Sequence, residues 1–377
     1  MSGAVPVPAW DAELTAADET PPWDPDRDDT LVCRAVRVET HDVKTFVFSG
    51  RSPCRFRFKP GQFITLDVPV DDTVVNRCYT VASSAARPHR IAITVKRVPG
   101  GPVSNWLHDH MVPGRALRAV GPMGVFSPAG RPPAKYLFLS AGSGITPLMS
   151  MARTLDDLAV ERDVVFVHAA RSPADIIFRA ELDAMARGGT GFRLAHLCEA
   201  TGGEPQWPGY TGRLSLPMLR LIAPDLLERD LYVCGPGPFM AAVRAMAREA
   251  GVDPARYHEE SFNFAELPAE VAADADAVEA PPAAETPAVA AGFKIEFTKS
   301  GRTIECGGDT RILEAASAAG IRLPSSCSRG LCGTCKSRLL SGRVEMKHGG
   351  GIRQREIDQG QILLCCSRPV SDLVIER

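Results

Sequence analysis

Four cysteines near the C-terminal end of the chain constrain its fold more than any other feature of the sequence. Cys327, Cys332 and Cys335 follow one another as C-x4-C-x2-C, and 29 residues separate Cys335 from Cys365. This spacing is typical of a [2Fe–2S] cluster, for which a tightly wound loop supplies three thiolates and a distant segment supplies the fourth. A structural zinc site usually contains two paired cysteine knuckles, whereas this sequence contains one such pair. We therefore predict that these four thiolates hold a [2Fe–2S] cluster rather than zinc.

The length and composition indicate a soluble protein with more than one domain. The chain has 377 residues, of which 45% are hydrophobic and 23% are charged, and a single hydrophobic core rarely extends over so many residues. No stretch approaches the ~20 uninterrupted apolar residues that cross a bilayer, and the N-terminus lacks the basic and apolar segments of an export signal. We therefore expect a cytoplasmic protein without membrane contact, whose 11 cysteines do not form a disulfide framework.

The charge of the chain is unevenly distributed. The whole chain has a formal net charge of −2, but residues 293–377 contain 14 Lys and Arg against 9 Asp and Glu. These basic residues are not interleaved with aromatic side chains, so the sequence does not support nucleic-acid binding. The excess of positive charge around the cysteines instead suggests docking on an acidic patch of a partner protein.

The first 131 residues divide into an arm and a β-rich domain. Residues 1–29 are rich in Pro, Asp, Thr and Ala without a period, and we interpret them as an N-terminal arm, either disordered or held to a domain by Trp10 and Trp23. Residues 30–131 contain short segments of alternating β-branched and aromatic residues, separated by Gly and Pro. No long helical pattern intervenes, which favours a small antiparallel β-barrel or sandwich.

Residues 132–265 have the pattern of an α/β domain with a parallel sheet. Continuously apolar strands such as YLFLSA and DVVFVHAA alternate with amphipathic segments, among them a helix expected over residues 176–186. Strands that are apolar throughout are typical of a parallel sheet covered by helices on both faces. This pattern predicts a doubly wound domain.

The last part of the chain begins after a segment of very different composition. Residues 266–291 contain no aromatic residue, no Lys and no Arg, and prolines interrupt any helical pattern, so we interpret them as a flexible linker. Residues 292–377 contain a hairpin pattern (FKIEF and RTIEC), a short helix (RILEAASAAG), the cysteine-rich loop and a terminal strand (LVIE). The expected fold is an α+β sheet with one helix packed on it.

A candidate flavin site lies in the β-rich domain, at Arg77-Cys78-Tyr79-Thr80. An arginine can pair with a flavin phosphate, a tyrosine can stack on the isoalloxazine ring, and a hydroxyl can bond flavin N5. Four residues of this kind also occur by chance as a surface arginine beside a core tyrosine. Downstream, Gly101 leads into a helix that we expect to start near Ser104, where free N–H groups favour a diphosphate.

A candidate nicotinamide site lies at two glycine-containing turns of the α/β domain. The segment Leu139–Pro147 (LSAGSGITP) joins the first parallel strand to its helix, with Gly142 and Gly144 permitting a tight turn. The segment Cys234–Pro238 (CGPGP) follows a later strand of the same sheet. Ligands of open α/β sheets bind at the carboxyl ends of the strands, so both turns are placed to contact a dinucleotide.

These motifs together resemble those of the ferredoxin–NADP reductase superfamily, whose flavin motif has the form R-x-Y-[ST], and the last 85 residues resemble plant-type ferredoxins, which have a β-grasp fold. The resemblance implies a flavin site formed by Arg77, Tyr79, Thr80, Val95, Lys96, Gly101, Val103 and Ser104. It implies a nicotinamide site formed by Gly142, Gly144, Thr146, Pro147, Arg171, Asp175, Cys234, Gly235 and Pro236. The catalytic positions would be Thr80, Thr146 and Cys234, close to the transferred hydride.

The sequence leaves an alternative for each nucleotide cofactor, FMN in place of FAD and NADPH in place of NADH. Members of the superfamily that use FMN carry the same flavin motif, but the segment SSAARPHR leaves room for an adenosine half and favours FAD. Arg171 could hold the 2′-phosphate of NADPH, whereas Asp175 could hold the ribose hydroxyls of NADH. The form ARSPADIIF resembles NADH-using oxygenase reductases, so we expect NADH.

The order of the modules suggests the function. From about Leu31 onward the chain resembles reductase components of two-component Rieske-type monooxygenases, in particular those that demethylate glycine betaine and related quaternary ammonium compounds. The resemblance implies electron transfer from NADH through FAD and the [2Fe–2S] cluster to a terminal oxygenase or another acceptor protein. A reductase of hybrid-cluster proteins, a stand-alone NADH diaphorase or flavin reductase, and a non-enzymatic thiolate module are the alternatives. Glu259, Glu260 and Phe262 lie either near the flavin or at a plain helix end where the linker starts.

Overall fold

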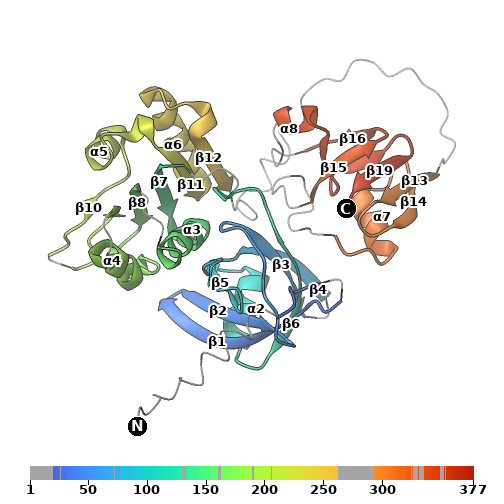
Figure 1. Ribbon diagram of the computed structural model, residues 1–377, viewed down its shortest axis with the longest axis horizontal. Coiled ribbons are helices and arrows are strands. Elements are labelled where there is room, and N and C mark those ends of the chain that lie inside the picture. Colours follow the sequence, from blue (N-terminus) through green and yellow to red (C-terminus); the bar gives the residue numbers. More distant parts are fainter. Residues whose placement is uncertain are drawn as a thin grey trace, which may run out of the picture. The chain divides into compact units, whose positions relative to one another are not determined.

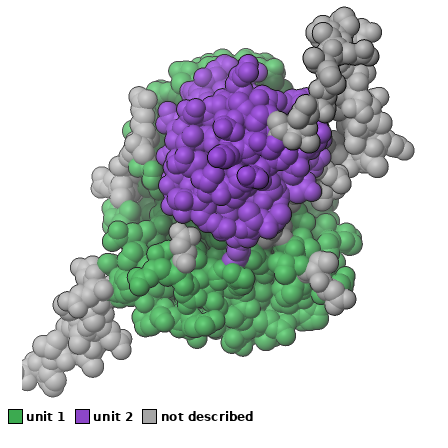
Figure 2. All heavy atoms as spheres, turned by 90° about the vertical axis from the view of Figure 1, so that its right-hand side faces the viewer, with its two compact units in different colours: residues 1–261 green, residues 262–377 purple. Residues whose placement is uncertain are grey.

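The computed structural model describes residues 20–25, 27–71, 73–129, 133–159, 163–188, 191–204, 206–261, 292–323, 325, 330, 335–348, 352 and 354–377. The chain forms two compact units, residues 1–261 and 262–377 (Figure 2). Among the described residues, the first unit contains two separate β-sheets, and the second contains a five-stranded sheet and a two-stranded one (Figure 1). The expected linker and Trp10 lie outside the described residues. The domain boundaries given above remain predictions.

The first sheet is antiparallel and closes on itself. Its strands are β1 (Thr30–Thr40), β2 (Val43–Gly50), β3 (Phe63–Val70), β4 (Thr73–Thr80), β5 (Ile91–Lys96) and β6 (Ala116–Met123), in the order β4-β3-β6-β1-β2-β5. Val81, which follows β4, bridges to Ile93 of β5, so the two ends of the sheet meet. Buried side chains such as Phe46 and Leu66 fill the interior, and Trp23 packs on Phe56 with ring centroids 5.3 Å apart. This confirms the antiparallel barrel.

The second sheet is parallel throughout, as predicted. Its strands are β7 (Lys135–Ala141), β8 (Asp163–Ala170), β9 (Phe192–Cys198), β10 (Tyr210–Thr211), β11 (Asp230–Gly235) and β12 (Tyr257–Ser261), in the order β10-β9-β8-β7-β11-β12. Its α-helices are α3 (Ile145–Asp157), α4 (Arg179–Gly188), α5 (Leu216–Ile222) and α6 (Gly237–Ala250). Phe138 of β7 packs with α3 and α4, while its neighbour Leu139 packs with α5 and α6. Both faces are therefore buried, which explains the uninterrupted apolar strands.

Three local expectations need correction. The helix expected over residues 176–186 begins only at Arg179, because Phe178 has a φ of 59° that a right-handed helix cannot contain. The helix expected near Ser104 is α2 (Pro102–His110), which starts two residues earlier. Glu260 lies neither at a helix end nor in a linker, since β12 pairs with β11 as an edge strand of the parallel sheet.

The second unit has the expected sheet with a helix on it, and this sheet contains both parallel and antiparallel strand pairs. The strands β13 (Gly292–Phe297), β14 (Arg302–Gly307), β15 (Lys336–Ser341), β17 (Gln361–Leu363) and β19 (Leu373–Glu376) have the order β14-β13-β19-β15-β17. A smaller sheet joins β16 (Val344–Met346) to β18 (Ser367–Pro369), and the helices are α7 (Ile312–Ala318) and α8 (Gln354–Asp358). The hairpin, the short helix and the terminal strand are confirmed. None of the helices in these described ranges is long and apolar enough to cross a membrane.

Candidate flavin, nicotinamide and iron–sulfur sites

The candidate flavin motif occupies the last four residues of β4. Arg77 pairs with Leu66 of β3, and Thr80 pairs with Phe63. The side chain of Thr80 is buried, yet its Oγ1 has no hydrogen-bond partner among the residues that the structure describes. A buried hydroxyl without a partner costs about 1–3 kcal/mol, so the position fits a group that accepts or donates a hydrogen bond to a bound ligand. Burial raises the pKa of Tyr79, which keeps its phenol neutral.

The candidate diphosphate site is the first turn of α2. Gly101 caps this helix, and Ser104 Oγ donates to the Gly101 carbonyl (3.2 Å) and accepts from the Val98 N–H (3.1 Å). A Cβ on Gly101 would come within 2.8 Å of Ser104 Oγ, so a larger residue here would displace this hydroxyl. The first-turn N–H groups of Val103 and Ser104 have no partner within the helix and can bind an anion.

The candidate flavin and nicotinamide sites adjoin one another. Gly142–Gly144 forms a 3-10 turn, η2, which lies against β5, the strand that carries Val95 and Lys96. The helix after this turn holds the segment that follows Thr80: Arg153 Nη1 of α3 donates to the Ala82 carbonyl at 2.6 Å. These contacts hold β5 and the segment after Thr80 against η2 and α3, the turn and helix of the candidate nicotinamide site.

The two nucleotide turns meet at Gly144 and Cys234. A Cβ on Gly144 would clash with the backbone carbonyl of Cys234 and with the backbone nitrogen of Gly235, so the two segments approach as closely as glycine allows. Thr146, in the first turn of α3, is buried and donates from Oγ1 to the Ser143 carbonyl at 3.2 Å. Burial raises the pKa of the Cys234 thiol well above its usual value, so Cys234 presents a neutral thiol.

The remaining predicted residues frame this meeting point. Pro147 is buried in the first turn of α3, and Gly142 has a φ of 51°, as a tight strand-to-helix turn requires. Pro236 is exposed and caps α6 directly after the end of β11.

Glu260 is a site residue that the sequence alone left open. It pairs with Cys234 in the β11–β12 register, and its Oε2 is shielded from solvent without a hydrogen-bond partner among the described residues. Burial raises the pKa of Glu260 to about 8. The chain thus places a carboxyl that is largely protonated at neutral pH beside the Cys234 thiol. The sequence named Glu260 as a candidate near the flavin but did not predict the strand, β12, that buries it.

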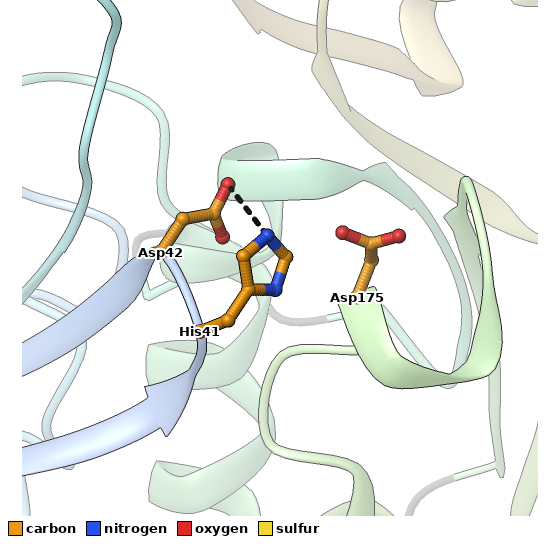
Figure 3. Close-up of side chains that lie close together, drawn as sticks. All are labelled: His41, Asp42 and Asp175. Atoms are coloured by element: carbon orange, nitrogen blue, oxygen red, sulfur yellow. Dashed lines mark ion pairs between the residues drawn. The ribbon is translucent and has the colours of Figure 1, made fainter.

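The loop after β8 contains a network of charges that sequence reasoning missed in part. Arg171 Nη2 lies 2.7 Å from Asp175 Oδ1, and the Ser172 hydroxyl donates to Asp175 Oδ2 (2.7 Å). Asp42, in the turn between β1 and β2, also faces Asp175, together with His41 (Figure 3). Their spacing would suit a metal ion, but Lys96 Nζ lies 3.2 Å from Asp42 Oδ2, so cations of the protein itself already neutralise the carboxylates.

Two of the four predicted cluster ligands lie within the described residues. Cys335, immediately before β15, and Cys365 are both buried. The Cys365 N–H donates to Cys335 Sγ at 3.4 Å, and the Gly330 N–H donates to Cys365 Sγ at 3.3 Å. Backbone N–H groups directed at sulfur suit thiolates that hold an iron–sulfur cluster. Cys327 and Cys332 lie outside the described residues.

Family models match all three parts of the chain. Residues 31–127 match the oxidoreductase FAD-binding domain, residues 138–245 the oxidoreductase NAD-binding domain, and residues 295–370 the 2Fe-2S iron-sulfur cluster binding domain. These matches confirm the expected FAD, NAD and [2Fe–2S] modules in the expected order.

Curated relatives match the chain over nearly its full length. The glycine betaine monooxygenase reductase subunit of Pseudomonas aeruginosa is 47% identical over 91% of this chain and 94% of its own. The stachydrine N-demethylase reductase subunit of Rhizobium meliloti is 41% identical, covering 92% and 96%. A solved phthalate dioxygenase reductase superposes with a TM-score of 0.59 at 25% identity and covers 94% of this chain and 100% of its own.

Proposed function

Since the chain belongs to the family of monooxygenase reductase components with FAD, NAD and [2Fe–2S] domains, we propose that it passes electrons from NADH to a terminal oxygenase that demethylates a quaternary ammonium betaine. The observation that carries the proposal is the 47% identity to a glycine betaine monooxygenase reductase subunit over 91% of the chain. Glycine betaine and stachydrine, named in two of the relatives, are both N-methylated betaines, which supports this substrate class for the oxygenase.

The residues of the chain support this function by holding and shielding the cofactors. When bound, FAD would supply the conversion between a two-electron hydride and the single electrons that a [2Fe–2S] cluster takes. Thr80 offers its buried hydroxyl to the ring of the flavin, and α2 offers N–H groups to the diphosphate. Thr146 and the neutral thiol of Cys234 are both buried, and they would help to exclude water from a bound nicotinamide. Cys327, Cys332, Cys335 and Cys365 would ligate the cluster.

The proposal includes a cytoplasmic location, where NADH is available and thiols stay reduced.

Reconstitution tests the proposal. The full-length protein, loaded with FAD and its cluster, is mixed with a purified glycine betaine oxygenase, NADH and the betaine, and formaldehyde is measured against NADH consumed. We expect formaldehyde release that depends on the reductase and approaches one molecule per NADH. NADH consumption without formaldehyde would contradict the proposal.

A cluster variant serves as the matched control. Cys365→Ser should abolish formaldehyde release, while reduction of ferricyanide by NADH, which can draw electrons directly from the flavin, should persist. If Cys365→Ser still supported the oxygenase at the original rate, electrons would not pass through the cluster.

A further inference from the structure

Arg171 is held by carboxylates from both sheets of the first unit. Besides its 2.7 Å pair with Asp175 in its own loop, its Nη2 lies 3.7 Å from Asp42 Oδ2, which belongs to the turn between β1 and β2 of the barrel. Figure 3 shows the carboxylates of Asp42 and Asp175 turned toward the same space from these two elements. Arg171, which could bind a 2′-phosphate, is therefore paired with two carboxylates, those of Asp42 and Asp175.

The carboxylate of Asp42 is fixed in this place. Its Oδ1 accepts a hydrogen bond from Thr40 Oγ1 (3.0 Å), and its backbone carbonyl accepts one from the Arg97 N–H (2.7 Å). The next residue, Val43, is buried in the hydrophobic cluster that contains Phe138 of β7, so the turn is anchored to the nucleotide-binding sheet. Burial alone would raise the pKa of Asp42, but its bonds to Lys96 and Thr40 hold that pKa below its usual value. Asp42 is thus ionised when the nucleotide binds.

The charges of this network balance. With His41, which lies 3.7 Å from Asp42 Oδ2, counted as neutral, Asp42 and Asp175 provide two negative charges, and Lys96 and Arg171 provide two positive charges. The 2′-phosphate of NADPH would bring further negative charge to a site with no net positive charge, whereas the ribose hydroxyls of NADH bring none. A neutral network therefore disfavours the binding of NADPH without weakening the binding of NADH.

We propose that Asp42 is a specificity-determining residue for the pyridine nucleotide, acting from the flavin barrel by neutralising Arg171 together with Asp175. The proposal rests on the proposed function, because it assumes that NADH is the donor. It assigns part of the nucleotide preference to a residue outside the nucleotide-binding sheet.

Asp42→Asn tests the proposal in the full-length, FAD-loaded protein. The rate of flavin reduction by NADPH and by NADH is measured by stopped flow, and binding of NADP⁺ and NAD⁺ by difference spectra. Loss of one negative charge should raise kcat/KM for NADPH, and the affinity for NADP⁺, about fivefold, with NADH changing less than twofold. Because the Asp42–Arg171 pair is partly exposed, its loss should leave the protein folded and flavin-loaded.

Two further variants separate the possible causes. Adding Arg171→Gln to Asp42→Asn should remove the gain with NADPH, since the freed guanidinium is the group that binds the phosphate. Asp29→Asn breaks another barrel ion pair, with Arg118, and should leave the nucleotide preference unchanged. An unchanged preference in Asp42→Asn would overturn the proposal while leaving the proposed function intact, and failure of the wild type to accept electrons from NADH would overturn both.

Discussion

The Thr80 hydroxyl is buried and has no hydrogen-bond partner among the described residues. We therefore expect it to form a favourable hydrogen bond only when a ligand is bound. Thr80→Val should slow the reduction of bound FAD by NADH roughly three- to tenfold, the worth of about one hydrogen bond. The same change should not destabilise the flavin-free protein, because it removes an unsatisfied group. Stopped-flow absorbance and thermal unfolding measure the two effects.

A second threonine of the barrel provides the control. Thr94 Oγ1 and Thr45 Oγ1 lie 2.8 Å apart and satisfy one another. Thr94→Val should therefore cost roughly 1 kcal/mol of stability by leaving Thr45 unpaired, with little effect on flavin reduction. If both variants behaved alike, the special role of the Thr80 hydroxyl would be excluded.

The buried carboxyl of Glu260 should make the free energy of unfolding depend on pH. Its pKa rises from an ordinary 4.5 to about 8 through burial, so between these values the folded state binds more protons than the unfolded state. The free energy of unfolding should consequently fall as the pH rises from about 4.5 to about 8. Glu260→Gln should flatten this slope, as urea unfolding at a series of pH values would show. An identical slope in wild type and variant would mean that Glu260 is not buried as a neutral acid.

The site residues that sequence could predict are those that lie in short local motifs. Thr80, Gly144 and Cys234 each belong to a contiguous run whose residue types suit a cofactor. Asp42 could not be found in this way, because only the packing of distant segments brings it beside Arg171. Glu260 was named from the sequence, but its position stayed open because its pairing with Cys234 depends on the sheet register. Their roles follow from sheet register and from a turn between two barrel strands, which no local pattern encodes.

The close approach of η2 to the end of β11 depends on Gly144. Gly144→Ala would place a methyl group against the Cys234 carbonyl and should cost about 1–3 kcal/mol in stability, while displacing the nucleotide turn. We expect NAD⁺ affinity to fall roughly tenfold or more with the flavin retained. Gly188→Ala is the matched control, since nothing lies within 4 Å of its added Cβ. Equal NAD⁺ affinities in the two variants would contradict this account of the turn.

At the level of elements, the sequence predicted most of the sheets because burial imposes clear patterns. The apolar runs of β7 and β8 and the alternation in β2 all coincide with observed strands. The start of α4 was predicted wrongly because Ile176, Ile177 and Phe178 are apolar for a different reason: they pack into the core from a turn. An apolar segment that joins a loop to the core cannot be distinguished from a helix by periodicity alone.

For the whole molecule, the excess of basic residues in 293–377 bears on the partner. If this module docks on an acidic patch of the oxygenase, raising the salt concentration should slow reduction of the oxygenase by several-fold. Reduction of FAD by NADH within the same chain should change little. Stopped-flow measurements over a range of salt concentrations compare the two rates, and salt-independent reduction of the oxygenase would exclude electrostatic docking.

The proposed function requires that NADH, FAD and a [2Fe–2S] cluster form one electron path within this chain. An anaerobic titration of the purified protein with NADH, followed by visible absorbance and electron paramagnetic resonance, tests this path. The flavin and iron–sulfur bands should both bleach, a reduced-cluster signal should appear, and completion should need more than one equivalent of NADH, because the flavin takes two electrons and the cluster takes another. Bleaching of the flavin alone, with no iron–sulfur band and no signal, would contradict the claim.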